Sequence, residues 1–244
     1  MKLSSFGKFF IDAIFPKFCL GCGKEGELVC QDCISTIEIL EYQFCPFCKT
    51  QKRVFEKGTC KNHRKKYLNG LFAATSLDDP LVKKLIHNFK YSPFLKELSK
   101  PLAYLIISHF LLSENKLIHK KNNNKDLIIP VPLTNLKKRQ RGFNQSELIA
   151  NQISTSLKAA VVSNILIRQK KTMSQTSLSE NERKENIKNA FFVKTPEKIN
   201  GKRIFLVDDV FTTGATMEEC SKTLKNAGAK EVWGIVVARE MLKF

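Results

Sequence analysis

Short apolar runs alternate with helical stretches over most of the chain. Apolar runs of strand length cover residues 70–75, 127–132, 160–167, 190–193, 204–207 and 231–238. Helices are predicted over residues 81–91, 95–112, 145–157 and 215–227. The clearest is the first, in which Leu81, Leu85 and Phe89 recur at helical spacing behind Pro80. The alternation of strand, helix and strand predicts an α/β fold, with a mostly parallel sheet flanked by helices.

Three polar stretches interrupt this pattern. Residues 114–126, rich in lysine and asparagine, are typical of a surface loop. A basic loop is expected between residues 133 and 144. It contains Lys137, Lys138, Arg139 and Arg141. Residues 168–189 form a long polar segment without a strand signal.

The first 18 residues predict a short amphipathic helix. Phe6, Phe10 and Ile14 recur at helical spacing. Lys8 and Asp12 interrupt the apolar run, and no small-residue cleavage site follows, so a secretory signal is not indicated. We expect the helix to dock on its own protein. No run of eighteen apolar residues occurs, so we expect no transmembrane span and a cytoplasmic location.

The chain is strongly basic. It has 41 Lys and Arg against 23 Asp and Glu, a net charge of +18, while its hydrophobic fraction of 43% is ordinary for a globular protein. An excess of positive charge favours phosphate-rich partners such as nucleic acid. The alternative is that many of the lysines simply cover solvated faces.

The cysteines mark a separate small unit at residues 19–66, ahead of a larger domain at residues 67–244. Seven of the eight cysteines lie in the first quarter of the chain, and three of their pairs are separated by two residues. A Cys-x-x-His pair completes the set. Two such tight turns close one tetrahedral zinc site, so the pattern predicts a double zinc ribbon.

The eight ligands divide between two zinc ions. Sequential pairing gives a first site of Cys19, Cys22, Cys30 and Cys33. It gives a second site of Cys45, Cys48, Cys60 and His63. An interleaved pairing is the alternative, and His63, which lies among basic residues, is either a ligand or an exposed histidine.

A strand-to-helix segment near the C-terminus carries the chemistry of a phosphate site. Asp208 and Asp209 follow the strand at 204–207, at the end where parallel sheets place ligands. Their carboxylates can accept hydrogen bonds from vicinal hydroxyls or help to hold a cation. A turn follows, made of Thr212, Thr213, Gly214, Ala215 and Thr216. It presents backbone N–H groups at a helix N-terminus, where a phosphate dianion is favoured.

This segment closely resembles the phosphoribosyl-pyrophosphate loop of type I phosphoribosyltransferases. The resemblance implies that Asp208 and Asp209 hold the ribose 2′ and 3′ hydroxyls and that residues 212–216 hold the 5′-phosphate. It also implies Mg²⁺ bound with phosphoribosyl pyrophosphate. Thr212 stands where the 6-oxopurine transferases carry an acid/base Asp, and a hydroxyl cannot replace that base near neutral pH. Hypoxanthine and guanine are therefore disfavoured as acceptors.

The same resemblance implies that basic side chains contact the pyrophosphate. The basic loop supplies Arg139 and Arg141. Residues 168–189 are implied to form a flap that excludes water, and Arg183 and Lys184 are the candidates for contacting the pyrophosphate from it. An exposed helix face is the alternative explanation of their charge.

Further strings resemble the ComF family of competence-associated proteins. They are Phe15-Pro-x-x-Cys19, the paired ribbons, Arg139-Gln-Arg141-Gly-Phe-Asn-Gln145, and a downstream set of Arg168, Thr172, Gln175, Arg183, Asn186, Ala190 and Phe191. The match spans nearly the whole chain and departs at residues 114–126 and at His63, where a cysteine is expected.

The resemblance implies handling of incoming single-stranded DNA during natural transformation, beside a helicase-like partner. Two functions are left open. One is a DNA-handling protein that keeps a phosphoribosyl pyrophosphate site, and the other is an active phosphoribosyltransferase on an unidentified acceptor, with a metabolic or salvage role.

Overall fold

The computed structural model describes residues 16–48, 50–55, 58–113, 115–119, 126–169 and 187–240. The helix predicted over residues 1–18 falls almost entirely outside these ranges, as do Arg183 and most of the predicted flap. None of the described helices is long and apolar enough to cross a membrane.

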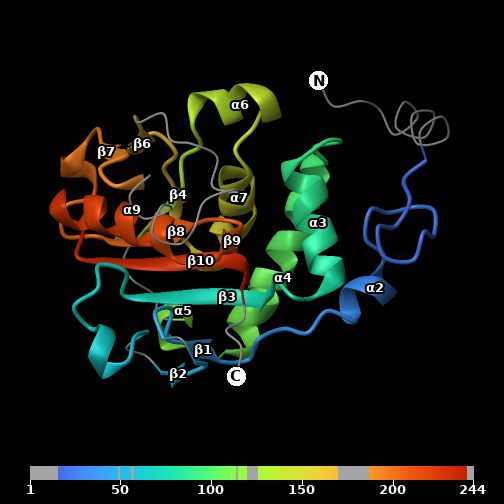
Figure 1. Ribbon diagram of the computed structural model, residues 1–244, viewed down its shortest axis with the longest axis horizontal. Coiled ribbons are helices and arrows are strands. Elements are labelled where there is room, and N and C mark those ends of the chain that lie inside the picture. Colours follow the sequence, from blue (N-terminus) through green and yellow to red (C-terminus); the bar gives the residue numbers. More distant parts are fainter. Residues whose placement is uncertain are drawn as a thin grey trace.

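A parallel sheet forms the centre of the molecule (Figure 1). Its five strands lie in the order β3 (Gly70–Ser76), β10 (Glu231–Arg239), β8 (Arg203–Val207), β4 (Leu127–Pro130) and β5 (Ala160–Val161). All four pairings are parallel, and the short strand β9 (Val210–Phe211) adds a parallel contact to the end of β10. The predicted fold class is confirmed.

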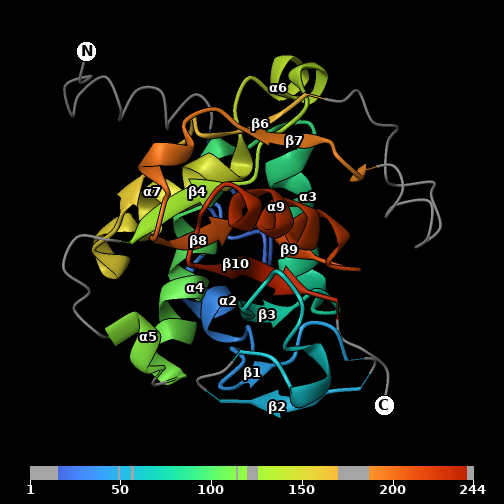
Figure 2. The same ribbon diagram turned by 90° about the vertical axis from the view of Figure 1, so that its left-hand side faces the viewer.

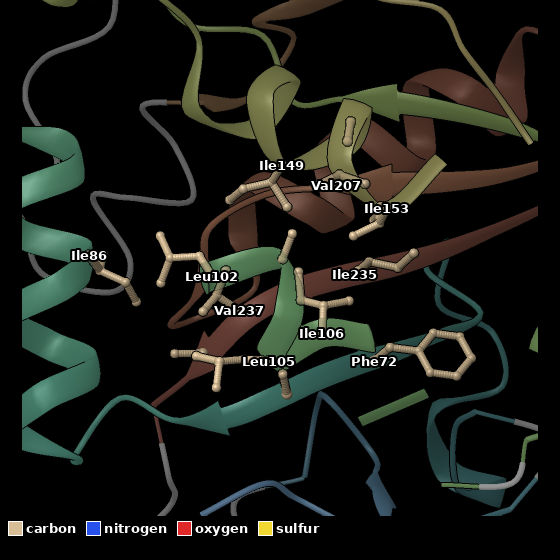
Figure 3. Packing of buried hydrophobic residues seen from close by; sticks show 14 of the residues in the cluster. Phe72, Ile86, Leu102, Leu105, Ile106, Ile149, Ile153, Val207, Ile235 and Val237 are labelled. Carbon is tan, nitrogen blue, oxygen red and sulfur yellow. The ribbon is translucent and has the colours of Figure 1, made fainter. Parts of the chain in front are cut away.

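Side chains alternate between the two faces of this sheet, which gives the protein two hydrophobic layers. In β8, Phe205 and Val207 face one layer while Ile204 and Leu206 face the other. The first layer lies under helices α3 (Pro80–Lys90), α4 (Ser99–Leu112) and α7 (Gln145–Leu157). In Figure 3, Ile149 and Ile153 of α7 lie beside Val207 of the sheet, and Ile86 of α3 lies beside Leu102 of α4. Helix α9 (Ala215–Asn226) covers the second layer.

Local capping explains where two of these helices begin. Asp79 accepts hydrogen bonds from the N–H groups of Leu81 and Val82, and Pro80 occupies the first turn of α3. Asn144 caps α7 in the same way through the N–H of Ser146. Caps of this kind contribute about 1 kcal/mol each. The helices predicted over 81–91, 145–157 and 215–227 are confirmed to within about a residue.

Several predicted boundaries differ from the structure. Residues 160–167 form two strands rather than one, because the chain turns at Ser163 and Asn164 after β5. The second of these, β6 (Leu166–Arg168), pairs with β7 (Phe191–Val193) in a separate antiparallel ribbon. A 3₁₀ turn, η2 (Lys96–Leu98), precedes α4, and a one-turn helix, α5 (Lys116–His119), lies within the predicted loop at 114–126.

The basic stretch predicted as a loop is helix α6 (Asn135–Arg141). The Thr134 side chain caps its start by accepting a hydrogen bond from the N–H of Lys137. Gly142 ends it with φ of 72°, a left-handed conformation that suits glycine. The prediction of a loop was wrong because it rested on the charge of the stretch and overlooked the helix-capping residues at its two ends.

The cysteine-rich region packs against the β3 edge of the sheet. It contains a short helix α2 (Gln31–Ser35), a 3₁₀ turn η1 (Lys61–His63) and a hairpin of β1 (Gln43–Phe44) and β2 (Arg53–Val54). Val29 and Ile37 join the hydrophobic layer under α3 and α4. The hairpin lies beyond β3, while α6 and the β6–β7 ribbon lie at the other end of the sheet (Figures 1 and 2).

Candidate functional site

A cleft of about 720 Å³ lies at the C-terminal ends of β4 and β8. Its floor is the segment that leaves β8, from Asp208 through β9 to the first turn of α9. All seven residues assigned to phosphoribosyl pyrophosphate from the sequence line this cleft. They are Asp208, Asp209, Thr212, Thr213, Gly214, Ala215 and Thr216. The crevice at the carboxyl ends of parallel strands is where open α/β sheets bind ligands.

Gly214 shapes the turn at the start of α9. Its φ is 75°, and a Cβ at this position would lie 2.5 Å from the ring of Phe211, so both conformation and space require glycine. The Gly214 carbonyl accepts the first helical hydrogen bond, from the N–H of Glu218 at 2.9 Å. Because glycine has no side chain to cap the helix, the positive end of the α9 dipole opens toward the cleft.

The two carboxylates of the cleft are held in different ways. Asp208 Oδ1 accepts hydrogen bonds from Ser146 Oγ and from the N–H of Asp209, both at 2.9 Å. Asp209 Oδ1 forms an ion pair with Lys90 Nζ at 2.9 Å, and its side chain is almost fully buried. Burial, and then the charge of Asp209, raise the pKa of Asp208 to about 7.

Four cationic side chains line the cleft together with these two carboxylates. They are Lys90, Lys137, Arg141 and Arg168. Burial lowers the pKa of Lys137, and the nearby charges of Arg141, Arg168 and Lys90 lower it further. Positive charges held this close to one another favour an anionic ligand between them.

Three arginines were assigned to the pyrophosphate from the sequence, and the structure places them differently. Arg141 lines the cleft. Arg139 lies on the exposed side of α6 and does not line it. Arg183 lies outside the described residues.

The sequence did not identify Lys90 or Ser146 as part of the site. Lys90 is the last residue of α3, and a lysine at that place is indistinguishable from any solvated helix end. Ser146 follows the quoted Gly-Phe-Asn-Gln string directly and lies in the first turn of α7. Tyr91 and Phe94 add an aromatic wall beside Lys90, again without a local sequence signal.

The eight metal ligands fall into two clusters, as sequential pairing predicts. In each cluster the four ligand atoms lie within 4.8 Å of one another. The Sγ atom of Cys30 lies 3.7 Å from those of Cys19 and Cys22. A zinc tetrahedron with bonds of about 2.3 Å has sulfur atoms about 3.8 Å apart, so this geometry fits the ion.

His63 belongs to the second cluster. Its Nδ1 atom lies 3.3 Å to 3.6 Å from the sulfur atoms of Cys45, Cys48 and Cys60. Three thiolates and one imidazole form an established donor set for structural zinc. The alternative of an exposed histidine outside the site is therefore wrong.

Comparison with known families matches both parts of the chain. Residues 98–241 match the phosphoribosyl transferase domain, and residues 10–63 match the double zinc ribbon domain.

Three relatives illustrate how far the similarity extends. The chain is 41% identical to "Competence protein F" of Haemophilus influenzae over 116 residues, which are 46% of this chain and 51% of that protein. It is 34% identical to "DNA utilization protein YhgH" of Escherichia coli K12 over 160 residues, 63% of this chain and 66% of the relative. It is 26% identical to "Competence protein ComFC" of Streptococcus pneumoniae over 204 residues, 84% of each. The match thus spans about half of the first relative and most of the third.

Proposed function

Because the chain belongs to the ComF family, with a double zinc ribbon ahead of a phosphoribosyl transferase domain, we propose that its cleft binds phosphoribosyl pyrophosphate. We further propose that the protein assists the handling of incoming single-stranded DNA in natural transformation. In this proposal it acts in the cytoplasm, beside a helicase-like partner.

One observation carries the proposal for the ligand. A helix N-terminus, an acid pair and a group of cations meet in a single cleft. Phosphoribosyl pyrophosphate has one group for each of these, since it joins a 5′-phosphate and a pyrophosphate through a ribose with two free hydroxyls. A nucleic-acid backbone lacks the terminal pyrophosphate that would match the cations.

Each part of the ligand is assigned to its own residues. The 5′-phosphate lies on the turn at 212–216, at the positive end of α9. The ribose hydroxyls donate hydrogen bonds to the carboxylates of Asp208 and Asp209. The pyrophosphate lies against Lys137 and Arg141, which α6 presents to the cleft.

Mg²⁺ fits this site because a carboxylate pair and pyrophosphate oxygens are the hard oxygen donors that it prefers. When bound, the ion neutralises part of the charge on the pyrophosphate. Lys90 holds the side chain of Asp209 through an ion pair, and the Ser146 hydroxyl holds Asp208 by donating a hydrogen bond to it. The protein thereby orients both carboxylates before any ligand arrives.

The role in DNA handling rests on the relatives and on charge. The names of the relatives concern competence and DNA utilization, and the chain carries a net charge of +18. A polyanion such as single-stranded DNA is the partner that this charge favours.

A second function, phosphoribosyl transfer to an unidentified acceptor, is favoured by the aromatic wall of the cleft. Tyr91 and Phe94 line the cleft on the side of Lys90, where a planar acceptor can stack. Thr212 cannot act as a carboxylate base, so this acceptor is one that needs no such base at that position.

One experiment separates these functions. Purified protein is incubated with phosphoribosyl pyrophosphate, Mg²⁺ and a panel of bases while pyrophosphate release is followed. Release that depends on one acceptor supports the transferase, and binding without release supports the DNA-handling protein. Failure to bind phosphoribosyl pyrophosphate at all rejects both.

A further inference from the structure

The β1–β2 hairpin of the second ribbon has one buried face and one exposed face. Gln43 pairs with Val54 on the inner face, and Gln43 is buried and accepts a hydrogen bond from Asn115 Nδ2 at 2.7 Å. The antiparallel register, continued by one residue, places Tyr42 opposite Phe55 on the outer face. Two aromatic residues therefore share the outward side of a very short hairpin.

Both rings are exposed to solvent. Phe55 is 83% exposed and Tyr42 is 45% exposed. Arg53 lies on the other strand of the hairpin, and its guanidinium lies 3.7 Å from the centre of the Tyr42 ring. The outer face thus offers an open phenyl ring beside a stacked cation. We name the surface of Tyr42, Arg53 and Phe55 the hairpin platform.

The surroundings of the hairpin platform are strongly basic. Residues 41–66 contain eight Lys and Arg and only two acidic residues. The exposed cations of this segment among the described residues are Lys52, Arg53, Lys61, Arg64, Lys65 and Lys66. Residues 16–40, which hold the first zinc cluster, contain two Lys and four acidic residues instead. Of the two ribbons, only the second therefore carries a net positive charge.

The second zinc cluster holds this hairpin in place. Cys45 follows β1 directly, and its N–H donates to the carbonyl of Lys52, just ahead of β2, at 2.9 Å. A two-residue strand pair has little stability in water by itself. Metal ligation at Cys45 and Cys48 compensates by fixing the turn that joins the strands.

We propose that the hairpin platform binds single-stranded nucleic acid, with unpaired bases stacked on Phe55 and Tyr42 and phosphates contacted by Arg53 and its basic neighbours. Exposed rings beside cations are what sequence-tolerant single-strand binders offer, because every base has a π-face and every phosphate a charge. Duplex bases are already stacked on one another and cannot reach the rings. This inference rests on the proposed role in DNA handling but places the contact outside the cleft.

The test is fluorescence anisotropy with a labelled oligo-dT strand, using zinc-loaded protein. The double variant Tyr42→Ala/Phe55→Ala is expected to bind at least about tenfold more weakly than wild type, the loss typical of one or two stacking contacts. The control variant Phe18→Ala removes an exposed ring from the first ribbon and is expected to leave binding unchanged. Phe18 is 53% exposed, close to the 45% of Tyr42. Zinc content and thermal unfolding show whether each variant is folded.

Two further variants separate stacking from charge. Arg53→Gln is expected to lower the slope of log affinity against log salt by about 0.7, the value for one phosphate contact on a single strand, whereas Phe55→Ala leaves the slope unchanged. Phe55→Trp is expected to retain affinity and to show quenching of its indole emission on binding, against the buried Trp233 as background.

The outcomes are distinguishable. If wild type binds oligo-dT and the double variant binds equally well, the hairpin platform is wrong while DNA handling by another surface stands. If wild type does not bind even at low salt, both the platform and direct DNA handling are overturned. Equal binding of duplex and single strand, with no quenching of Phe55→Trp, also contradicts base stacking.

Discussion

The cleft and the hairpin platform are both positively charged, yet they present their charge in opposite ways. In the cleft, Lys90 is paired with a buried Asp209, and Lys137 is half-buried. On the hairpin, Arg53 and Phe55 are open to solvent. Buried, paired charges define a shape that selects one small ligand, whereas exposed charges beside open rings suit a long polyanion of any sequence. The changes below test whether the two regions act independently.

The largest expected effect is loss of the second zinc ion. Cys60→Ser is expected to lower the zinc content from two ions per chain to one and to abolish oligo-dT binding, because structural zinc contributes on the order of 10 kcal/mol to the fold of a small ribbon. Binding of Mg²⁺ and phosphoribosyl pyrophosphate, followed by calorimetry, is expected to stay within about threefold.

The matched control is Cys22→Ser, which removes an exposed ligand of the first site. It also lowers the zinc content to one, but oligo-dT binding is expected to persist. Equal loss of DNA binding in both variants would erase the distinction between the ribbons.

The next effect belongs to the cleft. Gly214→Ala places a Cβ 2.5 Å from the Phe211 ring and holds alanine at φ of 75°, so the phosphate-binding turn must distort. Strain of about 1–3 kcal/mol predicts up to about 100-fold weaker binding of phosphoribosyl pyrophosphate in calorimetry. Oligo-dT affinity is expected not to change, and a parallel loss of both affinities would show that the two regions are coupled.

A smaller effect is expected from the cations of α6. Arg141→Ala is expected to weaken binding of phosphoribosyl pyrophosphate about tenfold, the size of a lost charge-assisted hydrogen bond. Arg139→Ala removes the same charge from the exposed side of the same helix. If both variants weaken binding equally, the contribution is general charge and not a contact within the cleft.

The smallest effect concerns stability. The pKa of Asp208 is raised from 3.8 to about 7, so the unfolded chain loses this proton more readily than the folded protein. The free energy of unfolding therefore falls as the pH rises from about 4 to 7. Above pH 7 the folded protein bears the full cost of ionising the buried Asp208 carboxyl group. Asp208→Asn keeps an oxygen for Ser146 and removes the cost of ionising a buried carboxyl group, so its melting temperature is expected to lie above that of wild type at pH 8.

Calorimetric melting of both proteins from pH 4 to pH 8 measures this difference. It is expected to shrink toward zero as the pH approaches 4. A variant that melts below wild type at pH 8 would show that Asp208 is stabilised by its neighbours and not strained by burial.

The features that could be predicted from the sequence are those encoded within a short segment of the chain. The strand β8, the acid pair and the turn at Gly214 lie within one short segment, so pattern and chemistry coincide there. The pairs of cysteines carry their own spacing, and the predicted grouping into two clusters is confirmed. The parallel sheet followed from the alternation of strands and helices.

Most of the features that could not be predicted from the sequence depend on contacts between segments that are distant along the chain. Lys90 reaches Asp209 across more than one hundred residues, and nothing in its own helix marks it. The hairpin strands are two residues long, too short to show the alternation that would reveal Tyr42 and Phe55 as one face. Helix α6 had readable caps, Thr134 and Gly142, but its charge suggested a loop.

Calorimetric titration of Mg²⁺ and phosphoribosyl pyrophosphate into wild type and into the double variant Asp208→Asn/Asp209→Asn tests whether the acid pair of the cleft holds this ligand. We expect saturable binding of one ligand per chain in wild type and none in the double variant, while both proteins retain two zinc ions and the same affinity for oligo-dT. Absence of binding to wild type, or equal binding to both proteins, would contradict it.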